Sequence, residues 1–563
     1  MMMIMKPYTN EQLYKTFAEL ELLDQKKLDE VYLSAKTANQ ELDDILLRYD
    51  LITDETLGKV VAQMLNLPLV RLSQTSIPDD ILRTIPEIVA RKQHAIVFKL
   101  DPKGLHIGLD NPKNTQIAEF IHKKTGLPVN IYYATKRDIE GAFNNYHKNV
   151  AEAFEDIIKH NIENARSKKN QEPSITKIVE TIILYAYENK SSDIHIEPFE
   201  NYSRIRFRID GILHDIVHLP KEIHAQIVSR IKVLSSLRID EHFTTQDGKL
   251  AFKTEYENVN IRVSIAPVTA GEKIVMRLLS ERSRQFSLRG LGFSESDFRK
   301  VQSAYERPYG LILSTGPTGS GKTTSLYAII KILNKGGVNI MTIEDPVEYD
   351  IEGINQMQVN VAADLTFAKG LRSIVRQDPD IILVGEIRDE ETAGIAINSA
   401  MTGHLVLSTM HTIDTATAIP RFYNMKVEPF LIGSTVNVII AQRLIRTICG
   451  KCRVSYELSI EKLANQVPHK LLYNQFGDRK QVRLYHGKGC AVCHNTGYSG
   501  RLGIFEVMTL NDEIRNLIIL KKNAQEIKKA SINNGMITML QDGLEKVNRG
   551  ITTVDEVLRV IKE

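Results

Sequence analysis

Apolar residues recur along this chain at two spacings, and the changes of spacing divide it into segments. Helical spacing dominates up to about residue 70, and short alternating strands then flank a turn at residues 101–104. This pattern predicts a helical plus α/β module over residues 1–145. Residues 146–173 are charged and poor in apolar positions, so we expect a helix and then a flexible linker.

Strict alternation marks the next segment, residues 174–282, with predicted strands at 204–210, 259–265 and 273–278. A period of two places Ile205 and Phe207 on one face of the first strand and its arginines on the other. An arginine-bearing face is either solvated or able to reach a bound phosphate, as arginine fingers do. The residues alone do not distinguish these two interpretations.

From residue 283 to 563, apolar strands alternate with helix-length segments. The strands are expected at 310–315, 338–343, 381–384 and 405–409. Such alternation predicts a mostly parallel sheet with helices on both faces. Ligands then bind at the carboxyl ends of the strands. The predicted class is a multi-domain α/β protein.

Composition adds limits rather than a function. A chain of 563 residues is too long for one core, and 72 basic against 69 acidic residues give a net charge of +3. That balance provides no global attraction to nucleic acid or to a membrane. The apolar start at Met1 to Met5 breaks at Lys6, and no apolar run approaches the length of a membrane span. We therefore expect a cytoplasmic chain that reaches a membrane only through partners.

The most informative motif is a phosphate-binding loop between a predicted strand and a predicted helix. Its glycines let backbone N–H groups face phosphate oxygens, Lys322 can reach the β and γ phosphates, and the Thr323 hydroxyl can ligate Mg²⁺. A fortuitous glycine-rich turn is the alternative, but apolar residues at helical spacing follow directly. The expected ATP-binding set is Gly316, Pro317, Thr318, Gly319, Ser320, Gly321, Lys322, Thr323 and Thr324.

Acidic residues follow two of the predicted strands. Glu386 ends the apolar strand 381–384 after one glycine, which makes it the candidate general base. Gly385 stands where an aspartate usually contacts the metal, so that contact must come from water or another residue. Glu344, Asp345 and Glu348 follow the preceding strand and are the candidates, although a solvated acidic loop would look the same.

Two histidines bracket the strand 405–409. His404 precedes it and His411 follows it. Lone histidines at strand ends are usually satisfied surface or core residues. At the carboxyl side of the sheet, however, His411 would approach the γ phosphate and sense its loss.

All four cysteines lie in two Cys-x-x-Cys pairs, Cys449 with Cys452 and Cys490 with Cys493. Two such pairs in one region predict a structural Zn²⁺ site with four thiolate ligands and no open position. The separation of the pairs exceeds the commonest spacing, so redox dithiols and plain buried cysteines remain alternatives.

Taken together, these motifs resemble the type II secretion and type IV pilus assembly ATPases of the GspE/PilB type. The matching segments are GPTGSGKT at 316–323, IEDPVE at 343–348, LRSIVRQDPD at 371–380, GEIRD at 385–389 and TGHLVLSTMH at 402–411. Upstream, SDIHIEP at 192–198, RFRIDG at 206–211 and QDGK at 246–249 resemble the second N-terminal domain of that family, and ITTVDEVLR at 551–559 resembles its C-terminal end.

The resemblance implies a RecA-like ATPase domain at residues 283–563, a PAS-like domain at 174–282 and a type II secretion ATPase N-terminal-like module at 1–145. It implies that Glu344 lies near the metal, that Glu386 is the catalytic glutamate and that His404 and His411 form a histidine box. It further implies that Arg206, Arg208, Arg262 and Arg277 approach the nucleotide and that the cysteines form a zinc-binding insertion at about 445–500.

The same resemblance implies a homo-hexameric ring that works with an inner-membrane platform protein and a cytoplasmic adaptor at the inner face of the membrane. Some relatives bind a cyclic dinucleotide through an N-terminal Arg-Leu-Gly pattern. The aligned stretch here reads Glu-Leu-Asp-Asp at 41–44, which argues against that regulation. Retraction-type relatives lack the N-terminal module and the cysteine pairs, so this chain resembles an extension or secretion motor.

The function predicted from these observations is a Mg²⁺-dependent ATPase that powers type IV pilus assembly. Type II secretion pseudopilus assembly uses the same motor parts and is the alternative. A nucleic-acid-translocating ring ATPase is the alternative of another class, against which the neutral net charge argues. A non-hydrolysing scaffold is a further one, against which Lys322, Thr323 and Glu386 argue.

Overall fold

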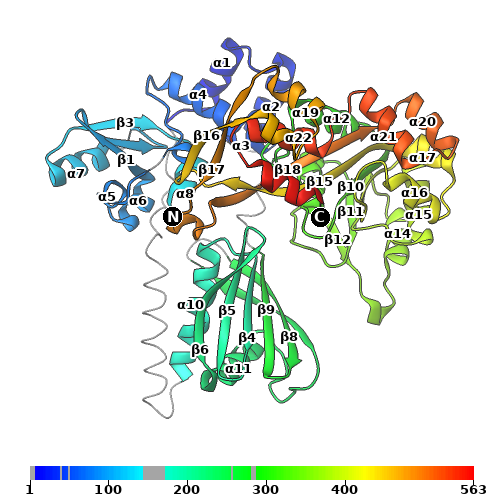
Figure 1. Cartoon of the computed structure of the whole chain (residues 1–563), viewed down its shortest axis with the longest axis horizontal. Coiled ribbons are helices and arrows are strands. Elements are labelled where there is room, and N and C mark those ends of the chain that lie inside the picture. Colours follow the sequence, from blue (N-terminus) through cyan, green and yellow to red (C-terminus); the bar gives the residue numbers. More distant parts are fainter. Residues whose placement is uncertain are drawn as a thin grey trace.

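The computed structural model describes residues 7–37, 41–48, 51–75, 77–113, 115–143, 172–254, 258–279 and 287–562 (Figure 1). The linker expected at 146–173 lies outside the described residues, apart from its last two positions. The expected boundary at 282/283 also lies outside them.

The N-terminal module combines a helical part with a three-stranded sheet of order β1-β2-β3. Each part has its own apolar core. The Thr53 hydroxyl caps α4 by accepting a bond from the Thr56 N–H, which explains where that helix begins. The elements are α1 (Asn10–Glu19), α2 (Gln25–Thr37), α3 (Leu42–Arg48), α4 (Asp54–Met64), η1 (Leu72–Gln74), α5 (Asp79–Leu82), α6 (Glu87–Gln93), β1 (Ala95–Asp101), β2 (Gly104–Leu109), α7 (Thr115–Thr125), β3 (Val129–Tyr133) and α8 (Lys136–Ala142).

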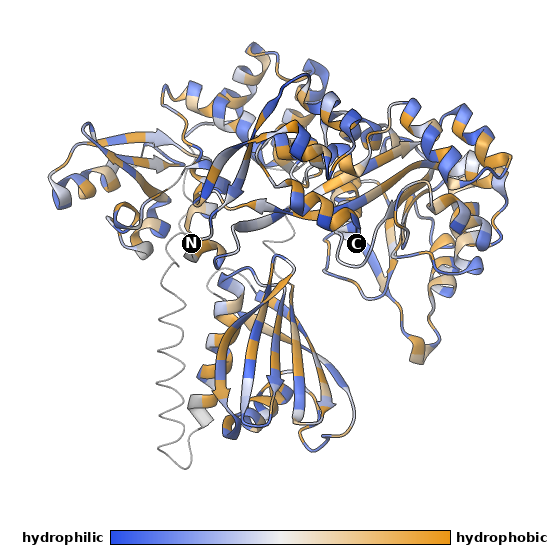
Figure 2. Ribbon diagram, viewed as in Figure 1, coloured by the Kyte–Doolittle hydropathy of each residue, from blue (hydrophilic) through white to orange (hydrophobic). Residues whose placement is uncertain are grey.

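A six-stranded antiparallel sheet of order β6-β5-β4-β9-β8-β7 follows. Figure 2 shows apolar and polar residues alternating along its strands. As predicted, Ile205 and Phe207 are fully buried, and they pack beneath helices α10 and α11. The elements are α10 (Glu172–Glu188), β4 (Asp193–Pro198), β5 (Tyr202–Ile209), β6 (Ile212–Pro220), η3 (Lys221–Ile223), α11 (His224–Leu234), β7 (Gln246–Lys253), β8 (Asn258–Val268) and β9 (Gly271–Leu279).

The third sheet has the order β12-β11-β13-β14-β10-β15-β18 and is parallel except for β18. Helices cover both faces over two apolar cores, which confirms the predicted α/β arrangement. The elements are α12 (Glu295–Tyr305), β10 (Gly310–Thr315), α13 (Lys322–Leu333), β11 (Ile340–Glu344), β12 (Asn355–Gln358), η5 (Val361–Ala363), α14 (Phe367–Val375), β13 (Ile381–Val384), α15 (Glu390–Met401), β14 (Leu405–Met410), α16 (Ala418–Asn424), α17 (Pro429–Thr435), β15 (Val436–Ile448) and β18 (Tyr498–Thr509).

Between β15 and β18 the chain leaves the sheet and forms a small excursion, and after β18 it ends in helices. The excursion holds β16 (Arg453–Ser459), α18 (Ile460–Ala464), α19 (His469–Phe476), β17 (Gln481–Gly487) and η6 (Ala491–Cys493). The last helices are α20 (Asp512–Ile519), α21 (Ala524–Asn533), α22 (Met539–Asn548) and α23 (Val554–Lys562). Among the helices of the described residues, none combines the length and the apolar run that crossing a membrane requires.

Candidate nucleotide-binding and metal sites

Four neighbouring strands end in a row at one edge of the third sheet. Thr315 of β10 pairs with Met410 of β14, so the phosphate loop begins beside His411. Val384 of β13 pairs with Ser408 of β14, which brings Glu386 to the other side of His411. Glu344 ends β11, the next strand along. This edge is where a parallel sheet binds its ligand.

The phosphate loop depends on glycine at positions that other residues would strain. Gly319 and Gly321 have φ of 77° and 88°, in the left-handed region. Lys322, the first residue of α13, is 8% exposed and donates to the carbonyls of Gly316 at 2.9 Å and Pro317 at 3.0 Å. Burial lowers the pKa of Lys322 to about 8, although nearby Glu386 acts in the opposite direction. Thr323 and Thr324 follow as half-buried residues in the first turn of the helix.

The Glu386 carboxylate contacts one cationic side chain, Arg388, and one titratable side chain, His411. Its Oε1 pairs with Arg388, and its Oε2 lies 3.4 Å from Nε2 of His411. The carboxylate is largely buried, and its Oε2 has no hydrogen-bond partner among the described residues. Burial and, to a lesser extent, Lys322 lower the pKa of His411, which favours its neutral form. The pair is suited to orienting a water molecule rather than to forming a closed ion pair.

Glu344 ends its strand at the predicted edge, but its carboxylate is occupied by protein donors. Tyr327 of α13 donates to Oε2, while Thr342 at 2.6 Å and Gln356 at 3.2 Å donate to Oε1. Burial and this carboxylate strongly raise the pKa of Tyr327. Glu344 therefore ties β11 to the helix of the phosphate loop, a contact that strand-end reasoning did not anticipate.

His404 does not join His411. It precedes β14, whereas the phosphate loop lies at the far end of that strand, about 20 Å away at 3.3 Å per residue. Its Nδ1 lies 2.9 Å from the carbonyl oxygen of Ser399. Within this chain the two histidines lie at opposite edges of the sheet, because residues that bracket a strand lie at its two ends. The histidine box that the resemblance implies stays a prediction.

The predicted arginines differ in what they contact. Arg206 binds Glu197 Oε1 at 2.7 Å within its own sheet. Arg208 and Arg277 flank Asp193, at 3.5 and 2.9 Å.

Arg262 bonds to the loop after β11. It donates to the carbonyl of Val347, and its Nη1 lies 3.4 Å from Glu348 Oε2. Arg262 thus bonds across to the strand ends that carry the site, and Arg277, its neighbour on β9, lies close enough to Glu348 for the charge of that residue to raise its pKa.

The four cysteine sulfur atoms converge to within 4.8 Å of one another. Sγ atoms of Cys449 and Cys490 lie 3.8 Å apart, as do those of Cys452 and Cys493, while Cys490 and Cys493 are separated by 3.7 Å. A tetrahedral ion with Zn–S bonds of about 2.3 Å requires sulfur separations of about 3.8 Å. The thiols are free rather than disulfide-bonded. The geometry therefore fits Zn²⁺ better than two separate dithiols.

Sequence reasoning missed three polar residues beside the phosphate loop and Glu386: Arg388, Ser325 and Gln442. Gln442 lies in β15, a strand that was not predicted. The available signal was an amide placed directly after the mostly apolar run 436–441, because an amide next to core residues needs bonding partners.

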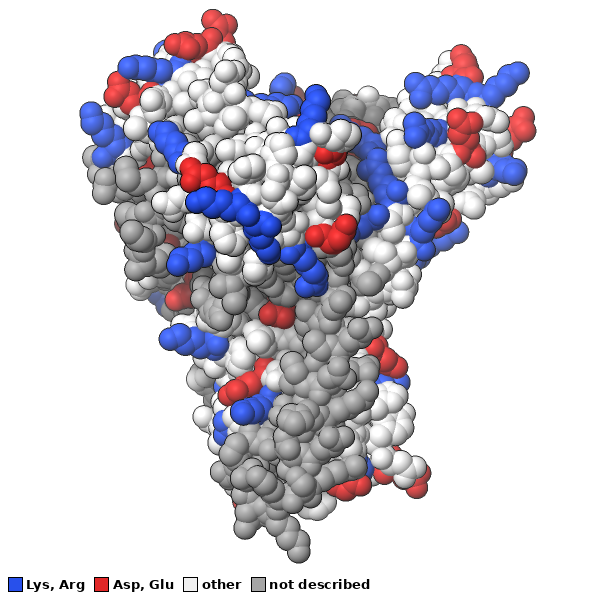
Figure 3. All heavy atoms as spheres, turned by 90° about the vertical axis from the view of Figure 1, so that its left-hand side faces the viewer, with Lys and Arg blue, Asp and Glu red and all other residues white. Residues whose placement is uncertain are grey.

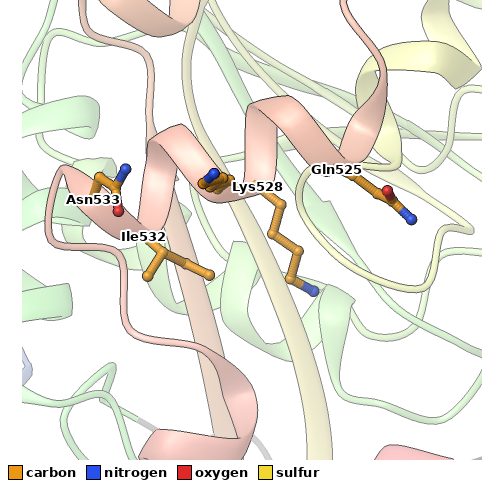
Figure 4. Close-up of a pocket in the computed structure, with 5 residues that line it drawn as sticks. Gln525, Lys528, Ile532 and Asn533 are labelled. Atoms are coloured by element: carbon orange, nitrogen blue, oxygen red, sulfur yellow. The ribbon is translucent and has the colours of Figure 1, made fainter.

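Two surface features bear on other interpretations. A shallow hollow is lined by Gln525, Lys528, Lys529, Ile532 and Asn533, which all belong to α21 (Figure 4). It has no glycine-rich loop, and Lys528 is paired with Asp414 at 2.7 Å. On the face in Figure 3, the basic and acidic side chains of the described residues are interspersed.

A phosphate loop between a central parallel strand and its helix, with a carboxylate at the next strand but one, defines a RecA-like P-loop nucleotide triphosphatase. The chain belongs to the type II/IV secretion system protein family, whose model matches residues 168–559. It is an ATP hydrolase of that family. An MshEN domain model matches residues 65–152.

Two relatives and one solved structure illustrate the similarity. The type IV pilus assembly ATPase PilB of Myxococcus xanthus is 36% identical over 529 residues, covering 91% of this chain and 92% of that protein. The type II secretion system protein E of Xanthomonas campestris is 38% identical over 536 residues, covering 92% and 93%. The Legionella pneumophila ATPase DotB structure has a TM-score of 0.51 at 20% identity, covering 69% of this chain and 96% of that one, and supports the fold alone.

Proposed function

We propose that this chain is the subunit of a cytoplasmic hexameric motor that couples Mg²⁺-ATP hydrolysis to type IV pilus assembly. The observation that carries the proposal is the row formed by the phosphate loop, His411 and Glu386 at three neighbouring strand ends. Similarity to the M. xanthus pilus assembly ATPase over nearly the whole chain supports the pilus role.

Each side chain of the row has a role in the proposal. Backbone N–H groups of the loop bind phosphate oxygens, and Lys322 releases its two carbonyl partners to bind the β and γ phosphates. Thr323 holds Mg²⁺, which when bound neutralises phosphate charge. Glu386 accepts the proton of the attacking water, which Arg388 and His411 orient. Glu344, at the adjacent strand end, would act beside the metal after exchanging some of its protein donors.

Arg262 is the proposed contact from the antiparallel sheet to the nucleotide, because it already reaches the loop that follows Glu344. Arg206, Arg208 and Arg277 would have to exchange their carboxylate partners to reach a phosphate. His404, at the other edge of the sheet, could act only on another part of the assembly. The four cysteines would hold Zn²⁺ and so fasten the excursion between β15 and β18.

Motion rather than a released metabolite is the proposed output. Closure of the antiparallel sheet onto bound ATP and its release after hydrolysis would push on an inner-membrane platform protein, with a cytoplasmic adaptor at the same face. Type II secretion remains a second candidate, because the X. campestris protein is similar over an equal share of the chain.

The enzymatic part is tested by measuring phosphate release and particle mass together. Wild-type protein that hydrolyses ATP as a six-subunit particle, with hydrolysis lost in Glu386→Gln, would support the motor. An inactive monomer in every nucleotide state would contradict it. Stimulation by DNA with a steep dependence on salt would favour the nucleic-acid motor instead.

The biological part needs deletion of the gene in the organism that carries it. Loss of surface pili, restored by the wild-type gene and not by the Glu386→Gln gene, would support pilus assembly. If the deletion strain instead makes normal pili and retains secreted proteins inside the cell, the proposed function becomes type II secretion.

A further inference from the structure

Gln442 of β15 lies directly behind the phosphate loop. Because Thr315 of β10 pairs with Ala441, the next residues, Gly316 and Gln442, lie side by side where the loop begins. A side-chain carbon at Gly316 would come within 2.7 Å of the Gln442 carbonyl oxygen, and one at Gly321 within 2.9 Å of its Nε2. The loop is thus packed against Gln442 at both ends.

The amide of Gln442 bonds to the loop and to its helix at once. Its Nε2 donates to the carbonyl oxygen of Ser320 at 2.7 Å, and its Oε1 accepts from the Ser325 hydroxyl at 2.8 Å. Ser320 precedes the left-handed Gly321, and Ser325 lies in the first turn of α13. Gln442 is 2% exposed, so water cannot replace either bond.

We propose that Gln442 is a positioning residue for ATP binding. By holding the Ser320 carbonyl on one side of Gly321 and Ser325 on the other, it sets the turn that aims the loop N–H groups at the phosphates. The residue touches no phosphate itself and acts through the loop. The inference rests on ATP binding at residues 316–323.

The same strand provides a matched control at its other end. Asn437 donates from Nδ2 to the carbonyl of Tyr309 at 3.0 Å and accepts from Arg307 at 3.1 Å. It therefore braces the start of β10 as Gln442 braces its end, on the side away from the phosphate loop. Removing either amide side chain should lower the stability of the protein, because each makes two hydrogen bonds. Only the loss of Gln442 should change nucleotide binding.

The test compares Gln442→Leu with Asn437→Leu in the full-length chain. We expect Gln442→Leu to raise the Kd of ATP and of ADP about tenfold, the effect of losing about 1.4 kcal/mol of positioning. Hydrogen exchange of the amides at 316–323 should become faster in the nucleotide-free variant. Asn437→Leu should lower the melting temperature and leave both Kd values within about twofold of wild type.

Ser325→Ala removes one of the two bonds and keeps the amide, so it should have a smaller effect that does not add to that of Gln442→Leu. It also carries the test if Gln442→Leu does not fold. Unchanged Kd values in both variants, or equal losses in Gln442→Leu and Asn437→Leu, would overturn the inference. Failure of the wild-type chain to bind ATP would instead overturn the underlying nucleotide site.

Discussion

His411 Nε2 lies 3.4 Å from Glu386 Oε2, although the two residues are separated by a helix and a strand in the sequence. The contact exists because β13 and β14 are parallel neighbours in register and both residues follow their carboxyl ends. Arg388 pairs with Oε1 of the largely buried carboxylate, so Oε2, which faces a histidine whose neutral form is favoured, is the oxygen available to a water molecule. The proposed catalytic base is therefore defined by sheet order.

Replacing that base should separate binding from hydrolysis. Glu386→Gln keeps the size of the side chain but removes its ability to accept a proton, so turnover should fall by roughly 10²- to 10⁴-fold with the Kd of ATP nearly unchanged. Phosphate release and nucleotide titration measure the two effects. The exposed Glu391, paired with Arg372 nearby, provides the control Glu391→Gln, which should hydrolyse ATP normally. Normal turnover by Glu386→Gln would remove the assigned role.

Nucleotide binding should weaken in alkaline solution. The pKa of Lys322 is about 8 in the nucleotide-free protein, and only the protonated amine attracts phosphate. Bound phosphate raises that pKa, so binding at pH 8.5 should take up a proton and affinity should fall as pH rises above 8, by up to about tenfold per unit. Calorimetry in two buffers of different ionisation enthalpy measures the proton. An affinity for ATP that stays constant from pH 7 to 9 would contradict the prediction. Replacing the amine altogether, in Lys322→Ala, should abolish productive ATP binding.

The arginines of the antiparallel sheet should contribute unequally. Arg262→Gln removes a group that reaches the loop after β11, whereas Arg206→Gln removes one that binds Glu197 within its sheet. We expect turnover to fall on the order of 10²-fold in the first variant and much less in the second. Steady-state hydrolysis at saturating ATP checks this. Equal losses would indicate that all the arginines rearrange around the nucleotide.

Metal content should follow the cysteines. Cys490→Ser removes one of four converging sulfur atoms, so the variant should lose Zn²⁺ and the excursion between β15 and β18 should become sensitive to protease. Elemental analysis of purified protein gives the metal content directly. The control Ser455→Ala, in β16 of the same excursion, should retain the metal. An unchanged zinc content in Cys490→Ser would contradict the proposed zinc site.

The last helix should loosen in acid. Burial raises the pKa of Glu556, but the bonds that it accepts from Arg559, at 2.8 and 3.0 Å, and from Arg446, at 2.7 and 3.0 Å, lower it to about 2. A lowered pKa means that its stabilisation is present above the ordinary value of 4.5 and is lost as pH falls toward 2. Glu556→Gln should remove that pH dependence and cost about 3 kcal/mol at pH 7. Thermal unfolding at several pH values measures it, with Glu545→Gln, at a half-buried glutamate paired with Arg549, as control.

Several parts of the fold and site were predictable because they depend on short-range patterns. Strand β10, helix α13 and their glycine-rich connection follow from periodicity and from the backbone freedom of Gly319 and Gly321. The alternation that buries Ile205 and Phe207 is equally local. No local pattern decides the role of His404: strand β14 separates it from His411, and the histidine box that the resemblance implies stays a prediction.

The sequence by itself determined the phosphate loop, the alternating strands and the paired cysteines, because each depends on residue types a few positions apart. Only the tertiary structure decided that Glu344 bonds to Tyr327, that Arg262 rather than Arg206 reaches the nucleotide domain, and that Gln442 braces the loop from a strand more than a hundred residues away. These contacts depend on strand order and on the packing of separate sheets. No local pattern encodes that order, because it results from burying all the apolar faces at once.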